Sequence, residues 1–212
     1  MTAALLAVAL LIVGWFALGS IVNVRKGHAA MRWLQGGLPL IGKRTTVRWL
    51  GTTSVVLTIA EAQPPFEQAT LVVFLEARDV PWLWALSHAR GRRDTLIVRA
   101  QLRHEPTEEV VLLDRRSWSG RDALRRMSGA RWSVREPAAG AELATYYKFE
   151  RALGVADAMM PAARGAGIKV RRLALRRGQP NFEVHADLPG GSAAAGEFFA
   201  ALRAMADRAA QA

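Results

Sequence analysis

The most continuous feature of the hydrophobic pattern is an apolar stretch near the N-terminus. Twenty consecutive residues from Ala3 to Val22 carry no charge, and eleven of them are Leu, Ile, Val or Phe. As a helix this stretch would be about 30 Å long, which matches the hydrocarbon thickness of a bilayer. The pattern therefore predicts one transmembrane anchor over residues 1–24, and no later stretch predicts a second span.

Two other interpretations of this stretch stay open. A cleaved signal peptide could end at the small-x-small sequence Ala17-Leu18-Gly19. Such peptides, however, have a basic N-terminal region that is missing here and an apolar region of about 7–15 residues. The other interpretation is the core helix of a soluble domain, but a helix that is apolar on all sides needs a larger protein to bury it.

Alternating apolar and polar residues follow the anchor, which is the pattern of half-buried strands. Residues 69–77 are apolar on both faces, as in a central strand, and 109–114 is expected to pair with 94–103 as an antiparallel hairpin. A second hairpin is predicted around Gly178-Gln179-Pro180-Asn181, with Phe182, Val184, Ala186 and Leu188 facing inward. The predicted strands are 46–61, 69–77, 94–103, 109–114, 169–177 and 182–188.

Helix signals lie between these strands. Asp79 is expected to cap a short helix over 79–89, with Pro81 in its first turn, and a second helix is expected from Ser119 to Met127. Residues 141–153 are compatible with a helix, and 154–167, rich in Gly, Ala and Pro, are expected to form a loop. Ser192 is expected to cap a closing helix whose apolar stripe is Phe198, Phe199, Leu202, Met205 and Ala209.

These elements predict an α+β fold. The expected architecture is one N-terminal transmembrane helix followed by one domain, residues 46–212, of mainly antiparallel sheet with helices on one face. A chain of 212 residues has room for one ordinary domain plus the anchor.

The charge distribution predicts an orientation. The net charge of +11 comes mostly from arginine, with four lysines in the chain. An Arg-rich and Ala-rich composition is what a GC-rich genome produces, so the charge alone does not favour nucleic acid as a partner. Three cations, Arg25, Lys26 and Arg32, follow the apolar stretch closely and none precedes it. The positive-inside rule therefore places the domain on the cytoplasmic side of a bacterial inner membrane or a plasma membrane.

The basic juxtamembrane segment, residues 25–45, has two interpretations that we weigh equally. Its cations, Trp33 and several aliphatic residues suit a segment lying in the headgroup zone of the bilayer. The alternative is a helical extension that ends at Gly36-Gly37 and leads into a loop packed on the domain.

Catalytic, cofactor and metal sites are not predicted. The absence of cysteine excludes disulfides, thiolate metal sites and thiol nucleophiles. The four histidines are scattered. His185 lies between Glu183 and Asp187, which could make it a base with an orienting carboxylate, but alternation places it on a solvated outward face. Pro189-Gly190-Gly191-Ser192 is interpreted as a turn and helix cap rather than an anion site.

A second basic region carries the one functional signal of the domain. Seven arginines face a single acid, Asp122, and are interleaved with Trp118 and Trp132, a combination that can bind anionic groups. A solvated surface is the plainer interpretation. The seven arginines are Arg115, Arg116, Arg121, Arg125, Arg126, Arg131 and Arg135.

The sequence resembles no family that we can name, and the functional hypothesis is accordingly general. We expect a membrane-anchored, non-enzymatic cytoplasmic adaptor or accessory domain that binds a protein partner or an anionic lipid surface. The alternatives are an enzyme of an unrecognised class acting at the membrane and, less favoured, a nucleic-acid-binding domain. The residues expected to bind lipid or partner are Arg25, Lys26, Arg32, Trp33, Trp118, Arg121, Arg125 and Arg126.

Overall fold

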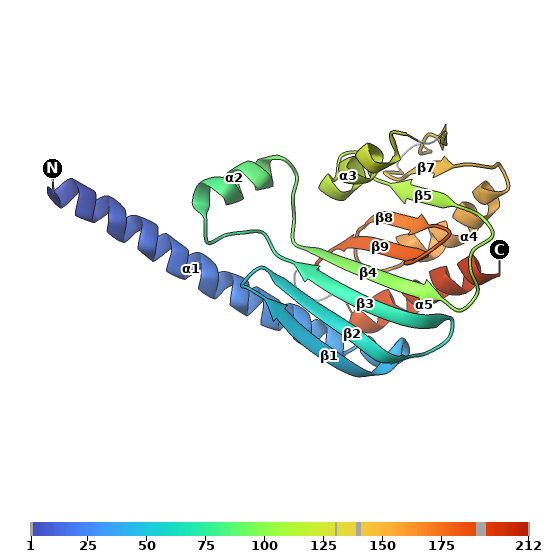
Figure 1. Cartoon of the computed structure of the whole chain (residues 1–212), viewed down its shortest axis with the longest axis horizontal. Coiled ribbons are helices and arrows are strands. Elements are labelled where there is room, and N and C mark those ends of the chain that lie inside the picture. Colours follow the sequence, from blue (N-terminus) through green and yellow to red (C-terminus); the bar gives the residue numbers. More distant parts are fainter. Residues whose placement is uncertain (1, 130, 139–140, 190–193, 212) are drawn as a thin grey trace.

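The computed structural model describes residues 2–129, 131–138, 141–189 and 194–211. In these residues, nine antiparallel strands form one open sheet, and the N-terminal half of a long helix, α1 (Thr2–Gln35), projects from the domain (Figure 1). The predicted α+β class is confirmed.

The strands are β1 (Gly42–Leu50), β2 (Ser54–Ala62), β3 (Phe66–Phe74), β4 (Thr95–Leu102), β5 (Val110–Leu113), β6 (Ser133–Arg135), β7 (Ala144–Tyr147), β8 (Val170–Leu175) and β9 (Phe182–Asp187). Their order in the sheet is β1-β2-β3-β4-β9-β8-β5-β7-β6. The remaining helices are η1 (Leu38–Leu40, a 3-10 turn), α2 (Pro81–Ala89), α3 (Trp118–Met127), α4 (Ala152–Arg164) and α5 (Ala195–Ala210).

Helix α1 is continuous over 34 residues and has two different halves. The large apolar side chains of the first half are exposed, and by length and composition this helix could cross a membrane. The second half packs on the domain along one narrow face. A Cβ at Gly19 would lie 2.2 Å from the carbonyl oxygen of Arg78, and one at Gly27 would lie 2.6 Å from the ring of Trp49. The buried residues of this face are Gly19, Asn23, Gly27, Ala30 and Leu34.

The juxtamembrane segment packs on the domain. Leu34, Leu38 and Ile41 are buried, and the ring of Trp33 contacts the rings of Phe198 and Phe199. The structure therefore agrees with the second alternative, a helical extension that ends at Gly36-Gly37 and is followed by a segment packed on the domain. These apolar side chains are buried in the domain and cannot lie among lipid headgroups.

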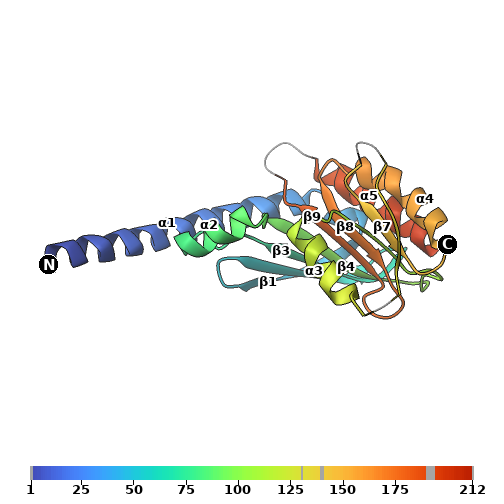
Figure 2. The same cartoon turned by 90° about the horizontal axis from the view of Figure 1, so that it is seen from above.

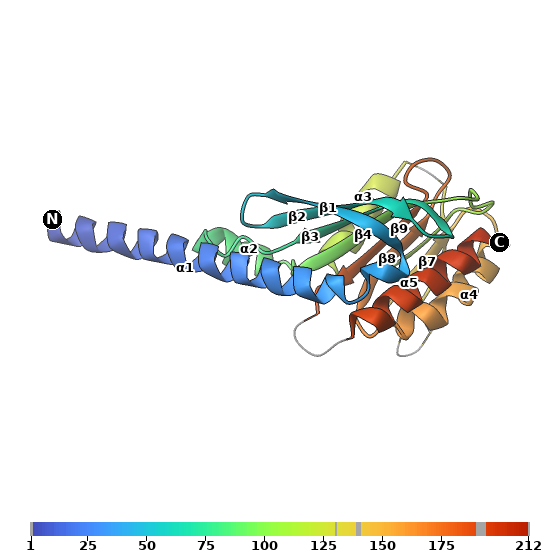
Figure 3. The same ribbon diagram turned by 90° about the horizontal axis from the view of Figure 1, so that it is seen from below.

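The main core lies between the sheet and a helical layer made by α4, α5 and the second half of α1 (Figure 3). Four phenylalanines fill its centre: Phe66, Phe182, Phe198 and Phe199. The apolar stripe predicted for the closing helix is buried as expected, while its predicted cap, Ser192, lies outside the described residues, as do Gly190 and Gly191.

Helix α3 packs on the opposite face of the sheet. Its Ala123 and Met127 meet Val111, Leu113 and the outward residues of β7 and β8 in a second, smaller cluster. The prediction that helices cover one face of the sheet thus holds for α1, α4 and α5. Helix α3 covers part of the other face. This helix is capped by Ser117, two residues before the predicted start, through a bond from the N–H of Gly120.

The predicted strand 46–61 is wrong in one respect: it is a hairpin. Strand β1 begins earlier, at Gly42, and the chain turns at Gly51-Thr52-Thr53 before β2. Gly51 adopts a φ of +70°, which glycine accepts without strain. The inner face of β2, formed by Val55, Leu57 and Ile59, is as predicted.

The expected pairing of 94–103 with 109–114 is also wrong. Strand β4 lies between β3 and β9, while β5 lies between β8 and β7, so the two are separated by the whole β8–β9 hairpin. That hairpin is confirmed, with Phe182, Val184 and Ala186 fully buried.

The predictions for residues 141–167 are reversed in the structure. Part of the helix-compatible segment is strand β7, which pairs with β5 and carries Tyr146 and Tyr147. The expected loop is helix α4, whose small and apolar residues recur at helical spacing and allow close packing on α5. Strand β6 was not predicted. Helix α2 is confirmed, but Val80 rather than Asp79 occupies its cap position.

Candidate functional site

A cleft of about 350 Å³ opens on the sheet face that carries α3. Residues of β4, β8 and β9 line its floor, and residues of α3 and of the turn that follows α2 line its walls. Figure 2 shows α3 beside these three strands. We call it the arginine cleft. Its charged lining consists of Arg92, Arg93, Arg99, Arg116, Arg126, Arg171, Arg172, Asp122, Glu183, Asp187 and His185.

Glu183 is the centre of the charged floor. It accepts hydrogen bonds from His185 Nε2 at 2.8 Å and from Arg99 Nε at 3.2 Å, and it lies 3.1 Å from Arg172 Nη2. Burial alone would raise the pKa of Glu183, but the hydrogen bond from His185 and the surrounding cations lower it below its ordinary value. The carboxylate is therefore held ionised.

His185 is buried, with 5% of its surface exposed, so the prediction of a solvated residue is wrong. Its strand alternates as expected, but the outward side of β9 faces the arginine cleft instead of open solvent. Burial lowers the pKa of His185, an effect that the neighbouring Glu183 only partly opposes. The neutral ring donates from Nε2 to Glu183, which leaves Nδ1 as an acceptor without a hydrogen-bond partner.

Two further arginines of the cleft are neutralised locally. Arg171 lies 2.6 Å from Asp187 and 2.8 Å from Asp114, and Arg126 lies 2.9 Å from Asp122. These pairs fix the guanidinium group of Arg171 on the inner strand β8 and that of Arg126 on α3.

Three cations of the cleft have no acidic partner in the part of the chain that the structure describes. Within the described residues, no carboxylate forms an ion pair with Arg92, Arg93 or Arg116. The guanidinium of Arg92 lies over the indole of Trp118 at 5.4 Å, and that of Arg93 donates to backbone carbonyls. The lining as a whole has seven arginines and three carboxylates, so it favours an anionic ligand.

Trp118 separates the arginine cleft from a second, more open hollow. The indole is 44% exposed and lines both. The second hollow also contains Arg90, Arg121 and Arg125. Arg121 donates to the carbonyl oxygens of Arg116 and Arg90, so its side chain holds the turn after α2 against α3.

The predicted residues of α3 are thus brought together at the two hollows. Trp118 and Arg126 line the arginine cleft, and Arg121 and Arg125 line its neighbour. Other members of the predicted basic region have acidic partners outside it, because Arg115 pairs with Glu136 and Arg135 with Asp157.

The predicted residues near the anchor do not join this site. Arg25 and Arg32 are exposed on α1, and Trp33 packs on α5. Lys26 takes part in an intramolecular network instead, with its Nζ 2.8 Å from Asp94. Whether any of these residues binds lipid stays a prediction.

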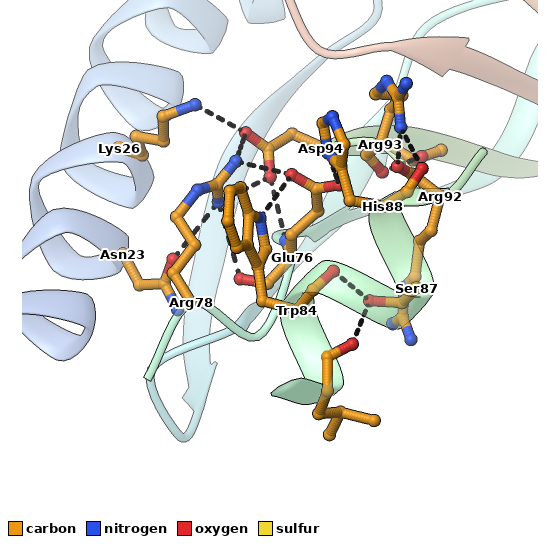
Figure 4. A network of polar contacts seen from close by, with 12 residues as sticks. Asn23, Lys26, Glu76, Arg78, Trp84, Ser87, His88, Arg92, Arg93 and Asp94 are labelled. Atoms are coloured by element: carbon orange, nitrogen blue, oxygen red, sulfur yellow. Dashed lines mark hydrogen bonds and ion pairs between the residues drawn. The ribbon is translucent and has the colours of Figure 1, made fainter. Parts of the chain in front are cut away.

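The network around Asp94 ties α1 to the domain (Figure 4). Arg78 binds both oxygens of Asp94 at 2.9 Å and also contacts Glu76 and Asn23. Glu76, which is 2% exposed, in turn bonds to two side chains of α2. These are Trp84, whose Nε1 donates at 3.3 Å, and His88, whose Nδ1 lies at 2.8 Å.

Sequence reasoning missed the floor of the arginine cleft. Arg99, Arg171 and Arg172 come from strands far from the basic region in sequence, and only the sheet order brings them to α3. The sequence does contain one signal for this floor. On the predicted hairpin, the outward positions of one strand carry Glu183 and His185, and the strand paired with it carries arginines.

The chain matches no known protein family, and a search of curated proteins finds no match. In the described part of the chain, no group of three or more His, Asp or Glu side chains could hold a metal ion.

Proposed function

We propose that this chain is a single-span membrane protein whose domain is a non-enzymatic adaptor on the cytoplasmic side of an inner or plasma membrane. In this proposal, the domain binds an acidic segment of a protein partner in the arginine cleft. The observation that carries it is a group of three guanidiniums that form no ion pair with any described carboxylate, beside an exposed tryptophan.

The membrane part of the proposal is supported by the first half of α1. Side chains such as Leu10, Leu11 and Val13 are at least 64% exposed, and a water-soluble chain rarely leaves a helix apolar on all sides unpacked. Arg25, Lys26 and Arg32 follow this half, and cations at one end of a span favour the cytoplasmic side for that end.

Two measurements test the anchor. Alkaline carbonate should leave the full-length chain in the membrane pellet, and protease added outside the cell should not digest the domain. The intact mass of the purified protein separates an anchor from a signal peptide, since cleavage after Gly19 would remove the first nineteen residues.

The binding part is supported by the chemistry of the cleft wall. Arginine and tryptophan are enriched among the residues that contribute most to protein interfaces. Arg92 is already stacked on Trp118, so less conformational entropy is lost when it binds a carboxylate. The pairs formed by Glu183 and Asp187 below keep the floor rigid.

A binding titration with the full-length protein in zwitterionic nanodiscs tests this part. We expect a fluorescent oligoglutamate peptide to bind, and the double variant Arg92→Ala/Arg116→Ala to weaken binding by about tenfold or more, or at least 1.4 kcal/mol. The matched control is Arg164→Ala/Arg208→Ala, which removes two exposed arginines from α4 and α5. Equal losses in both variants would show that only net charge matters and would contradict the proposal.

Other ligands give different results in the same assay. Competition by anionic lipid in the nanodisc would identify a headgroup as the occupant, and a steep salt-dependent affinity for DNA or RNA would identify nucleic acid. Either result would replace the acidic partner.

An enzyme is the second candidate function, because a cleft does converge on a histidine with a carboxylate at 2.8 Å. A general base works best with a pKa near the operating pH, whereas burial lowers the pKa of His185. An NMR titration that placed this pKa near neutrality, together with loss of a turnover reaction in His185→Gln, would favour the enzyme over the adaptor.

A further inference from the structure

Helix α2 has its apolar side turned outward. Trp82, Leu83 and Leu86 are 65%, 48% and 50% exposed, and no residue of this helix is buried. The opposite side carries Trp84 and His88, which bond to the buried carboxylate of Glu76 (Figure 4). A surface helix of a soluble domain normally has the reverse arrangement, with its apolar stripe toward the core.

The position of α2 along α1 indicates what covers this side. The chain just before α2 contacts the apolar half of α1, because Trp15 Nε1 donates to the carbonyl oxygen of Arg78 at 2.9 Å. Gly19 lies against the same backbone. At 1.5 Å per residue these contacts are about 9–15 Å along the helix from Arg25, toward the N-terminus. The chain that leads into α2 is therefore held beside the apolar part of α1, which would lie in lipid if α1 crosses the membrane.

The charges around α2 fit the same position. The helix itself, Pro81–Ala89, contains no Asp, Glu, Lys or Arg. Arg78, which precedes it, directs its guanidinium back to Asn23 and Asp94, near the level where the cations of α1 begin. Asp79 limits the depth, because a carboxylate is costly in hydrocarbon but not among headgroups.

A basic rim follows the apolar side. Arg90 comes directly after α2, and Arg125 of α3 lies in the same hollow, outside the arginine cleft. Cations beside an exposed apolar helix are complementary to the phosphates of an anionic leaflet.

We propose that α2 is an interfacial helix that lies in the headgroup zone of the bilayer crossed by α1, with Trp82, Leu83 and Leu86 directed into lipid. This inference rests on the proposed insertion of α1 and adds a second place at which the protein contacts the membrane. Its partner is the lipid bilayer itself.

The absence of cysteine makes a site-specific test clean. Single variants of the full-length protein carry a nitroxide label at Leu86→Cys on α2, at Leu10→Cys in the apolar half of α1, and at Ala204→Cys on the exposed side of α5. The proteins are placed in nanodiscs of phosphatidylcholine and phosphatidylglycerol. Collision of each label with oxygen, which concentrates in lipid, is compared with collision with a water-soluble nickel complex.

We expect the labels at Leu86→Cys and Leu10→Cys to collide more often with oxygen than with the nickel complex. The label at Ala204→Cys should collide more often with the nickel complex. If the label on α2 behaves like that on α5 while Leu10→Cys stays in lipid, the inference is overturned and the anchor stands. If Leu10→Cys also favours the nickel complex, the proposed anchor fails as well. A label on α2 that is shielded from both reagents would show a protein partner or a second copy of the chain there, and would overturn the lipid contact.

A second pair of variants guards against a misfolded label site. Leu86→Ser and Ala85→Ser both alter the exposed side of α2 and leave Trp84 and His88 in place. In detergent, both should unfold at the wild-type temperature. In anionic vesicles, Leu86→Ser should reduce protection of the 78–93 segment from protease more than Ala85→Ser does, whereas equal protection would contradict the inference.

Discussion

The two halves of α1 share one continuous helix but differ in what surrounds them. In the first half, a Cβ at Gly14 would meet nothing within 4 Å, and the leucines around it are exposed. In the second half, Gly19 and Gly27 touch the domain closely and Leu34 is completely buried. Helical periodicity of burial therefore begins at Gly19, inside the predicted anchor, and the difference separates the residues of α1 that pack on the domain from those that do not.

The largest expected effect comes from charging the first half. The double variant Leu10→Arg/Val13→Arg places two arginines near the middle of the proposed span, each costing about 2.5–3.5 kcal/mol on insertion scales. The chain should move from the carbonate-resistant pellet to the supernatant, while circular dichroism shows the same unfolding temperature for the domain. A protein that stayed in the pellet would contradict the assignment of this half to lipid.

Truncation in the second half should instead unfold the domain. Leu34→Ala removes a fully buried side chain and should lower the free energy of unfolding by about 2–5 kcal/mol, measured by denaturant titration in detergent. The control is Leu11→Ala, since Leu11 is 74% exposed and its loss should have little effect. Similar losses in both variants would erase the contrast between the halves.

Two glycines on the same helix give a closer comparison. Gly19→Val forces a side chain against the carbonyl of Arg78, and overpacking of this kind costs about 1–3 kcal/mol. Gly14→Val meets open space and should leave thermal unfolding unchanged. The boundary between the halves would be misplaced if Gly14→Val were the more damaging of the two.

The smallest effect concerns pH. Burial alone would raise the pKa of Asp94, but bonds from Arg78, Lys26 and the N–H of Glu76 lower it below its ordinary value. A carboxyl whose pKa is lowered in the folded state stabilises the fold at pH values above its unfolded-state pKa, and this contribution is lost as the pH falls through the folded-state pKa. The unfolding temperature of Asp94→Asn should therefore lie below that of the wild type at neutral pH, and this difference should shrink as the pH falls below about 4. A gap that persists in acid would mean that Asp94 acts through shape rather than charge.

The sequence predicted those parts of the fold that follow from local pattern. The apolar stretch of α1, the hairpin ending in Phe182–Asp187 and the stripe of α5 each carry a clear periodicity, and each is present. The hairpin at Gly51 was missed because Trp49 and Leu50 continue the apolar run into the turn. The partners of β4 and β5 depend on contacts across the whole chain, which no local pattern encodes.

The sequence predicted one wall of the candidate site but not its floor. The wall formed by α3, with Trp118 and Arg126, was visible as a basic run with aromatic residues. The floor was not, because burial of His185 depends on α3 and the turn after α2 covering an outward sheet face. Alternation within a strand indicates which residues share a face, but not whether another element covers that face.

Because α1 continues without a break from its apolar half into the core, there is no hinge between the proposed span and the domain. A flexible tether would let the domain sweep a hemisphere and search for partners in any direction. A continuous helix instead fixes the height and tilt of each surface of the domain relative to the bilayer plane. Rotation about the helix axis is then the main motion that remains. Proteins that meet this one would then have to present their contact sites at one set height.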